Sequence, residues 1–255
     1  MKRIVILTKL VFNAFFPWVD PVKKQSARFE LIRGGALLFN IQVYNNLLWW
    51  HEDALYKKMW SNFPMANDKV HERRFNLFNL AKLAKGLKGD SAECGVFRGA
   101  GSHIILSALS SEGNNHHIFD SFEGLSVPEQ EDLVNDNELP KWEKGDLSEG
   151  ESVVKNNLSL FSERIKFYKG WIPTRYCEIS DKTFCLVHID VDLYQPTKDT
   201  LMFFYPRLVT GGLIICDDYG SKTCPGATKA MDEFFEDKPE SVIHLTSGTG
   251  FIVKS

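Results

Sequence analysis

Short apolar runs separated by helical segments follow one another from about residue 90 to the C-terminus. Five of these runs predict strands, and they cover residues 91–97, 116–122, 164–172, 183–192 and 211–219. The last two runs are the most hydrophobic, as expected for central strands that are covered on both faces. Strands that alternate with helices in this way predict a parallel sheet with crossover helices.

The end of the chain predicts a different connection. Residues 241–255 form two short strand-like runs about the turn from Gly248 to Gly250. This pattern predicts an antiparallel hairpin at the edge of the sheet. The whole succession therefore predicts a Rossmann-like α/β fold with a mostly parallel sheet of seven strands.

Residues 1–88 show no strand alternation and predict a helical N-terminal extension, which leaves residues 89–255 as the core. The first helix is basic and apolar, but Lys9 interrupts it, and the remainder is shorter than the ~20 residues that cross a bilayer. Three interpretations stay open: a helix packed on the domain or at a dimer interface, a helix in the membrane interface, or a signal sequence. In the second interpretation the interfacial side chains are Phe12, Phe15, Phe16 and Trp18.

Composition narrows the class of protein. A hydrophobic content of 44% and a charged content of 25% are near the globular average, and a net charge of -3 offers no basic field to nucleic acid. The five cysteines show no C-x-x-C spacing, so neither a disulfide framework nor a structural zinc site is indicated. We therefore expect a cytoplasmic protein with reduced thiols and a small-molecule ligand.

One segment is too long and too polar for an ordinary connection. Residues 125–150 are acidic, contain proline and hold few apolar side chains. Loops of this length in a compact domain are usually lids or disordered. Because the segment follows the second predicted strand, it is expected at the carboxyl edge of the sheet, where ligands bind in open α/β folds.

A glycine-rich turn, E-C-G-V-F-R-G-A-G in residues 93–101, joins the first predicted strand to a helix. Its glycines allow a ligand close to the backbone, although their spacing is not that of the G-x-G-x-x-G dinucleotide fingerprint. Glu93 would repel a phosphate, which favours a cofactor without phosphates, such as S-adenosylmethionine, over NAD. Asp120, at the end of the second predicted strand, is placed to accept hydrogen bonds from a ribose diol; the alternative is a turn-capping role.

Acidic residues end the fourth and fifth predicted strands. Asp190 and Asp192 are expected on the same face of the fourth, because side chains alternate with a period of two, and Asp217 and Asp218 end the fifth. If these strands are parallel neighbours, Asp190, Asp217 and Asp218 meet in one pocket, where their repulsion requires a divalent cation. Oxygen ligands favour Mg²⁺ over zinc, and Asp192 is the predicted general base. The alternative is a solvated acidic loop without a metal, and His188 is interpreted as a satisfied core histidine.

Five motifs stand in a fixed order along the chain: E-C-G-V-F-R-G-A-G-S, F-D-S-F-E-G-L, Y-K-G-W-I-P, H-I-D-V-D-L-Y-Q-P-T and G-G-L-I-I-C-D-D-Y-G. Together they resemble the TylF or macrocin O-methyltransferase family, which methylates sugar hydroxyls in antibiotic and related glycoside pathways. The resemblance covers about residues 70–255. It departs from the family after the third motif, which continues as P-T-R-Y, and the first 70 residues resemble nothing in it.

The resemblance implies a class I methyltransferase fold, S-adenosylmethionine as the methyl donor, Mg²⁺ as a cofactor and a sugar-containing small molecule or glycan as the acceptor. It also implies roles for residues that match the motifs. These are Glu93, Gly95 and Gly99 at the methionine end of the cofactor, Asp120 and Ser121 at the ribose, Gly170 and Trp171 at the adenine, Asp190, Asp217 and Asp218 at the metal, and Asp192 as the base.

Two other functions stay open. An NAD-dependent oxidoreductase is favoured by the α/β pattern and opposed by Glu93. A non-catalytic scaffold subunit with a methyltransferase-like fold is opposed by the four aspartates, which such a subunit would not need. We expect a homo-oligomer, and the first helix is the candidate for peripheral membrane contact. Trp49, Trp50 and Trp60 are expected in aromatic packing, with stacking on a sugar ring as the alternative.

Overall fold

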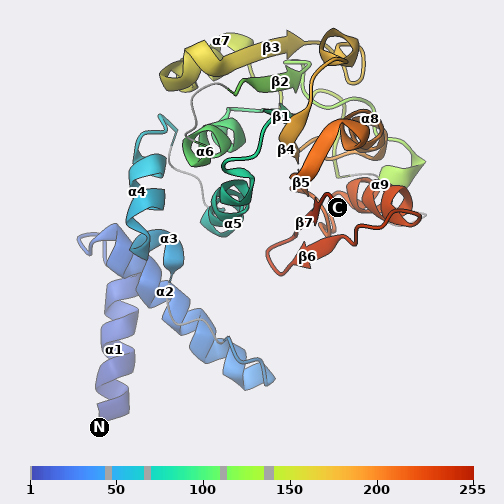
Figure 1. Cartoon of the computed structure of the whole chain (residues 1–255). Coiled ribbons are helices and arrows are strands. Elements are labelled where there is room, and N and C mark those ends of the chain that lie inside the picture. The colour runs from blue at the N-terminus through green and yellow to red at the C-terminus, as the bar shows by residue number, and fades with distance from the viewer. Residues whose placement is uncertain (1, 44–47, 66–69, 110–113, 135–140) are drawn as a thin grey trace. The chain divides into compact units, whose positions relative to one another are not determined.

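The structure is a computed structural model that describes residues 2–43, 48–65, 70–109, 114–134 and 141–255 (Figure 1). It divides into two compact units, Met1–Lys58 and Met59–Ser255. The sequence predicts a boundary at residue 88, which lies later in the chain. The two positions differ because helix α5 (His71–Ala81) packs against helix α6 (Ala100–Ala108) and so belongs to the second unit.

The second unit is built on one seven-stranded sheet, as predicted. In the order in which they pair, its strands are β3 (Ile165–Lys169), β2 (His116–Asp120), β1 (Asp90–Cys94), β4 (Phe184–Ile189), β5 (Leu208–Cys216), β7 (Thr249–Val253) and β6 (Ile243–Leu245). Strands β1 to β5 pair in parallel, and the hairpin of β6 and β7 joins β5 in antiparallel fashion at the edge. Because the strand order reverses between β1 and β4, the topological switch point lies there, where open α/β sheets bind ligands.

Helices cover both faces of this sheet (Figure 1). Helices α5 and α6 lie over one face, while α8 (Tyr194–Phe204) and α9 (Pro225–Phe235) pack on each other over the opposite face. Helix α7 (Glu151–Asn157) follows the long acidic segment. Strand β4 is buried along its whole length, as its run of apolar residues predicts for a central strand.

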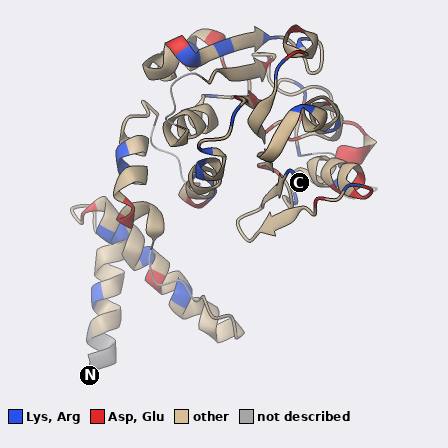
Figure 2. Ribbon diagram, in the orientation of Figure 1, with Lys and Arg blue, Asp and Glu red and all other residues tan. Residues whose placement is uncertain are grey.

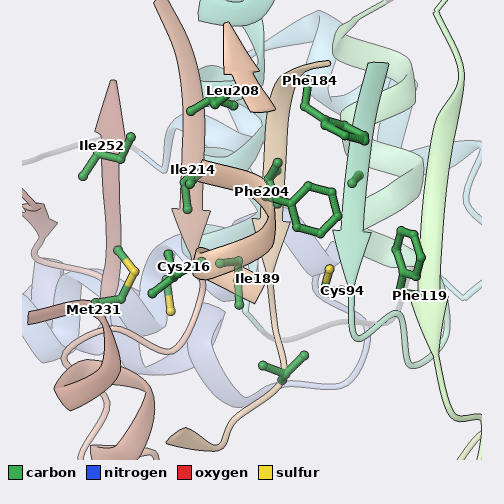
Figure 3. Packing of buried hydrophobic residues seen from close by; sticks show 14 of the residues in the cluster. Cys94, Phe119, Phe184, Ile189, Phe204, Leu208, Ile214, Cys216, Met231 and Ile252 are labelled. Carbon is green, nitrogen blue, oxygen red and sulfur yellow. The ribbon is translucent and has the colours of Figure 1, made fainter. Parts of the chain in front are cut away.

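The larger hydrophobic core lies between the sheet and helices α8 and α9 (Figure 3). Phe204 from α8 packs edge-to-face on Phe184 of β4, with ring centroids 4.9 Å apart. The ring centroid of Phe119 of β2 lies 6.0 Å from that of Phe204. Met231 of α9 and Ile252 of β7 extend this cluster to the edge of the sheet. This packing holds the carboxyl ends of the central strands in place.

Strands β1 to β5 each end two or three residues before the end of the predicted run, and for two of them the backbone gives a clear reason. Strand β1 ends at Cys94 because Gly95 has a φ of 80°, which no strand residue adopts. Strand β4 ends at Ile189, and Asp192 has a left-handed φ of 61°. The acidic residues after β4 therefore sit in a tight turn rather than on a strand.

The first unit consists of helices and turns, as predicted. Its elements are α1 (Lys2–Phe15), α2 (Pro21–Ala36), a 3₁₀ turn η1 (Leu37–Phe39), α3 (Trp49–Glu52) and α4 (Ala54–Ser61), which runs into the second unit. Asp20 caps α2, because its carboxylate accepts the amides of Val22 and Lys23 at 3.1 Å. Among the described residues, no helix has both the length and the apolar character that a membrane span needs.

Candidate active site

A cavity of about 650 Å³ opens at the carboxyl ends of β1, β4 and β5. The predicted site residues that line it are Glu93, Gly95, Asp120, Ser121, Trp171, Asp190, Asp192, Asp217 and Asp218. Two others do not line it: Gly99 caps the start of α6, and Gly170 donates its amide to the Asp120 carbonyl at 2.9 Å. The cavity therefore joins the predicted cofactor residues to the predicted carboxylate cluster.

The glycine turn brings the ends of β1 and β4 into close contact. A Cβ atom on Gly95 would lie 2.0 Å from the carbonyl oxygen of Asp190. The Asp190 amide in turn donates to the Cys94 carbonyl at 2.9 Å. Gly95 is therefore needed both for its positive φ and for the space that a side chain would occupy.

Glu93 is buried and already bonded to protein groups. Its Oε1 accepts from Nδ1 of His188 at 2.9 Å, and its Oε2 accepts from the Ser102 hydroxyl. The chain of polar groups continues through His116, which contacts the hydroxyls of Ser102 and Ser91 at 2.8 Å each. Burial lowers the pKa of His116 to about 3, so this imidazole is neutral. Glu93 can still accept from a ligand, because each carboxylate oxygen has a second lone pair.

Only one of the two ring nitrogens of His188 has a hydrogen-bond partner among the described residues, which corrects the interpretation as a satisfied core histidine. Its Nδ1 is bonded to Glu93, but its Nε2 is buried and has no hydrogen-bond partner among the described residues. That Nε2 lies 4.0 Å from Oδ1 of Asp217. Burial lowers the pKa of His188, but the carboxylates of Asp217 and Glu93 raise it by more, so the ring is a cation between two acids.

Asp120 caps two turns, the glycine turn that follows β1 and the turn that follows its own strand, β2. Its two oxygens accept the amides of Val96 and Phe122, each at 2.7 Å. The turn-capping role is thus observed, and the side chain also faces the cavity, where a ribose role stays a prediction. Ser121 donates its hydroxyl to the Gly124 carbonyl at 3.0 Å, which fixes the same turn.

The four aspartates line one cavity but form two separate groups. Asp190 and Asp217 lie with His188, and Asp192 and Asp218 lie with Cys224; within each group the ligand atoms are within 4.8 Å of one another. The sequence predicts Asp190, Asp217 and Asp218 as one set, and it places Asp190 and Asp192 together by strand alternation. That reason is wrong, because both residues follow the end of β4 and Asp192 adopts a left-handed conformation.

Hydrogen bonds fix the second group. The Asp192 amide donates to Oδ2 of Asp218 at 3.1 Å, and the Cys224 thiol donates to Oδ1 of Asp192 at 3.4 Å. Sequence reasoning missed Cys224 because a lone cysteine before a proline gives no sign of a contact 32 residues back in the chain. All five cysteines belong to the described part of the chain, and all are free thiols, as expected.

Crowding of buried charge dominates the electrostatics of the site. Burial, together with the neighbouring carboxylates, raises the pKa of Asp190 to about 7 and also raises the pKa values of Asp192 and Asp218. Asp217 behaves in the opposite way: burial raises its pKa, but His188 and Arg73 lower it by more. Buried carboxylates that lack enough positive charge are costly, so this set of oxygen atoms suits a hard divalent cation.

Arg73 of helix α5 is a site residue that sequence reasoning missed. Its guanidinium donates to the Asp217 carbonyl at 2.5 Å, forms an ion pair with the Asp217 carboxylate and lies 3.6 Å from Oδ1 of Asp218. Arg73 is 144 residues from Asp217 in the chain and stands in a helix with many polar residues. Nothing in the sequence pattern separates such an arginine from one on a solvated face.

Arg73→Ala is expected to change stability and cation binding in opposite directions. The free energy of unfolding should fall by about 1–3 kcal/mol, because Asp217 stays buried with one partner fewer. Binding of Mg²⁺ should become about tenfold tighter, because a positive charge is removed from the carboxylates. Urea unfolding and isothermal titration measure the two effects.

Arg98→Ala is the matched control, because Arg98 also lines the cavity but pairs with Glu149, and its side chain is 46% exposed. It should change stability by less than about 1 kcal/mol. Equal effects in the two variants would contradict a specific role for Arg73.

The long acidic segment lies at the cavity, as predicted for its place after the second strand. Leu125, Glu129 and Trp142 line the cavity, and residues 135–140 of the segment lie outside the described residues. Asp132 anchors it, because one oxygen accepts the Glu129 amide at 2.9 Å and the other accepts the Tyr194 amide at 2.8 Å, at the start of α8. The described part of this segment is thus held to the helix that follows β4.

Trp60 takes part in aromatic packing, as expected. It is buried, and its ring centroid lies 5.4 Å from that of Phe63 and 5.8 Å from that of His71. Trp49 lies in the first unit and is 49% exposed. The structure thus gives Trp60 a packing role, away from the residues that line the cavity.

Comparison with known proteins agrees with the resemblance seen in the motifs. Residues 63–243 match the family described as macrocin-O-methyltransferase (TylF). The demethyldecarbamoylnovobiocin O-methyltransferase of Streptomyces niveus is 29% identical over 159 residues, which are 60% of this chain and 60% of that enzyme. The 8-demethyl-8-(2,3-dimethoxy-alpha-L-rhamnosyl)-tetracenomycin-C 4'-O-methyltransferase of Streptomyces olivaceus is 31% identical over 152 residues, 57% of this chain and 58% of that enzyme.

A solved structure extends the comparison to the fold. The O-methyltransferase NovP superposes with a TM-score of 0.62 and 26% sequence identity, over 72% of this chain and 80% of that one. In sequence, the match to the two Streptomyces enzymes spans about three fifths of their lengths. The similarity is thus to O-methyltransferases, over the part of the chain that contains the cavity.

Proposed function

Because this chain belongs to the macrocin-O-methyltransferase (TylF) family, we propose that it transfers a methyl group from S-adenosylmethionine to a hydroxyl of a sugar-bearing small molecule. The observation that supports this most is the single cavity at the switch point, which is lined both by the glycine turn and by four aspartates. The two relatives carry O-methyltransferase names, and one of them names a rhamnosyl compound. An acceptor of similar chemistry is the proposal for this chain.

The cofactor would occupy the side of the cavity formed by the glycine turn. Glu93 and Gly95 would face its methionine end, with Gly99 supporting the turn at the start of α6. Asp120 and Ser121 would hold the ribose diol. Trp171 would border the adenine, and Gly170 would position Trp171 through the hydrogen bond that its backbone N–H donates to the Asp120 carbonyl.

The proposed metal is Mg²⁺, held by Asp190, Asp217 and Asp218. The residues fit such an ion in their chemistry: they are carboxylate oxygen donors with too little positive charge around them, and Asp217 and Asp218 are buried. Among the described residues, the buried Nε2 of His188 has no hydrogen-bond partner and lies 4.0 Å from Asp217. Asp190 and Asp217 lie in one group and Asp218 in the other, so a bound ion would draw the two groups together. When bound, the ion would lower the pKa of the acceptor hydroxyl. His188 would orient Asp217 from behind, as outer partners of metal ligands do.

Asp192 is the proposed general base. It is buried beside Asp218, and burial together with the carboxylate of Asp217 raises its pKa, so it is more basic than an ordinary aspartate. The acceptor hydroxyl would give its proton to a carboxylate oxygen of Asp192, while the acceptor oxygen takes the methyl group from the sulfonium sulfur. Positioning of the two reactants in one cavity would supply much of the rate enhancement.

The two alternative functions predict different ligands. A nicotinamide enzyme needs room for a pyrophosphate at the glycine turn, where Glu93 places a buried acid. A scaffold subunit would retain the fold without four aspartates in the cavity. Neither alternative accounts for the combination of residues in this site.

The proposal is tested by ligand binding and by methyl transfer. Isothermal titration should show binding of S-adenosylhomocysteine in the micromolar range and no binding of NAD at the same concentrations. Transfer of a labelled methyl group to demethyldecarbamoylnovobiocin, or to a rhamnosylated compound, should require Mg²⁺ and stop with EDTA. Binding of NAD without S-adenosylhomocysteine would contradict the methyltransferase function, and full activity in EDTA would contradict the metal.

A further inference from the structure

The first unit exposes most of its apolar side chains. Fifteen of the 27 exposed large hydrophobic side chains in the described part of the chain lie before residue 59. The buried apolar residues of that unit are only Ala14, Ala27, Leu48 and Tyr56 among those described. A pair of helices with so small a core gains little from its own packing, and exposed apolar surface of this extent marks an interaction site.

Aromatic side chains concentrate where α1 turns into α2. We call this group, formed by Phe12, Phe15, Phe16 and Trp18, the aromatic turn. The rings of Phe12 and Phe16 stack with centroids 4.1 Å apart, and the Trp18 ring lies 5.0 Å from Phe16. Phe15 and Trp18 are nevertheless 66% and 72% exposed. Aromatic rings in this state are typical of a surface that enters a membrane interface.

Positive charge accompanies the aromatic turn. Residues 1–58 contain nine Lys and Arg but four Asp and Glu, a net charge of +5, whereas residues 59–255 have a net charge of -8. Residues 1–19 contain no acid at all. Lys9 and Lys23 are exposed, and Nζ of Lys24 lies 3.4 Å from the Pro17 carbonyl, next to Trp18 in the chain. The blue segments along α1 and α2 in Figure 2 mark lysines and arginines of these helices. This arrangement complements a surface that is negatively charged.

We propose that the first unit docks this protein on an anionic lipid surface, with the aromatic turn in the headgroup region and the nearby lysines at the lipid phosphates. Helix α1 has 14 residues and is about 21 Å long, so it would lie in the interface and not cross the bilayer. A second copy of the same surface is a poorer partner, because two units of net charge +5 would be brought together. The inference is independent of the reaction catalysed in the second unit.

The test is sedimentation of the full chain with vesicles of phosphatidylcholine alone or with 30% phosphatidylglycerol. Binding is expected to the anionic vesicles only, and to weaken at high salt, because salt screens the lysines. Phe15→Ser with Trp18→Ser should weaken binding at least about tenfold by removing apolar insertion. Lys23→Glu should weaken it roughly 20-fold, because each basic charge near such a surface contributes roughly fivefold.

Matched controls come from the second unit. Leu160→Ser with Met202→Ser removes two side chains that are 66% and 60% exposed, and Lys88→Glu reverses an exposed lysine; these should bind as the unchanged chain does. Circular dichroism checks that each variant is folded. The proposal is overturned by equal binding to neutral vesicles, by no binding to anionic ones, or by equal losses in the controls. One further outcome would overturn it: the unchanged chain forms an oligomer and does not bind vesicles, and Phe15→Ser with Trp18→Ser dissociates that oligomer. The aromatic turn would then be a contact between copies of the chain.

Discussion

Replacing Asp190 by asparagine is expected to lower methyl transfer roughly a thousandfold while leaving the binding of S-adenosylhomocysteine within a few-fold of normal. Asp190 follows the end of β4, and its carboxylate lies with Asp217 and His188. The proposed ribose residues follow β2, which is separated from β4 in the sheet by β1. Asparagine keeps the size and removes the charge that a divalent cation requires. Isothermal titration with Mg²⁺ should show the corresponding loss of affinity.

The same variant should also change how the stability of the metal-free protein depends on pH. The pKa of Asp190 is raised to about 7, mainly by burial and then by Asp217, so the folded chain holds a proton that the unfolded chain has already lost above pH 4. The metal-free protein should therefore lose stability as the pH rises from about 4 to about 7. Asp190→Asn should reduce this loss and make the metal-free chain more stable at pH 8, which also excludes unfolding as the cause of lost activity.

Asp199→Asn is the control for both experiments. Asp199 also lines the cavity, from α8, but it belongs to neither aspartate group and accepts a hydrogen bond from the Gln195 side chain at 2.9 Å. Its neutralisation should leave Mg²⁺ affinity and the pH profile nearly unchanged. If the two variants behave alike, the charge of Asp190 has no special role and the proposed metal site is wrong.

Gly95→Ala is expected to cost about 3–5 kcal/mol of unfolding free energy. A methyl group at this position would lie 2.0 Å from the Asp190 carbonyl oxygen and 2.8 Å from its carbon, both backbone atoms that cannot rotate away. The φ of 80° adds the usual cost of a left-handed conformation. Relief requires β1 and β4 to separate, which would also displace Asp190, so cation binding should weaken in whatever protein remains folded.

Gly86→Ala separates the steric contact at Gly95 from the cost of its left-handed backbone conformation. Gly86 has a φ of 87°, and a methyl group there would meet nothing within 4 Å, so it shares the backbone conformation without the contact. Its substitution should cost about 1–2 kcal/mol in the same urea titration. Similar losses for the two alanine variants would show that the contact at Gly95 is readily relieved and that β1 and β4 are less tightly coupled than the structure indicates.

Much of the second unit follows from local pattern. The apolar runs of β4 and β5 predict buried central strands, and the turn before Gly250 predicts the edge hairpin that β6 and β7 form. The ends of strands are less well predicted, because apolar residues such as Val96 and Val191 continue beyond the point where the backbone turns. Burial of a side chain and membership of a strand are separate properties, and the sequence pattern reports the first.

The residues of the site were likewise predicted only in part from the sequence. Acids at the carboxyl ends of parallel neighbours must come near one another, and all four aspartates do line one cavity. Their grouping depended on the left-handed turn at Asp192, which strand alternation cannot anticipate. The contact of Arg73 with Asp217 depended on how α5 packs beside the sheet.

The amino-acid sequence alone determined the succession of strands and helices along the chain, the edge of the sheet where the acids gather and the family that the motifs resemble. The order of elements depends on short-range periodicity, and the acidic edge depends on the rule that parallel strands share one carboxyl edge. The family depends on the motifs themselves. Only the tertiary structure decided which cations face which carboxylates and where the two compact units divide. It also decided that one nitrogen of His188 has no hydrogen-bond partner in the part of the chain that the structure describes. The physical reason is that contacts between residues far apart in the chain are selected by the packing of whole elements, and no local pattern records that packing.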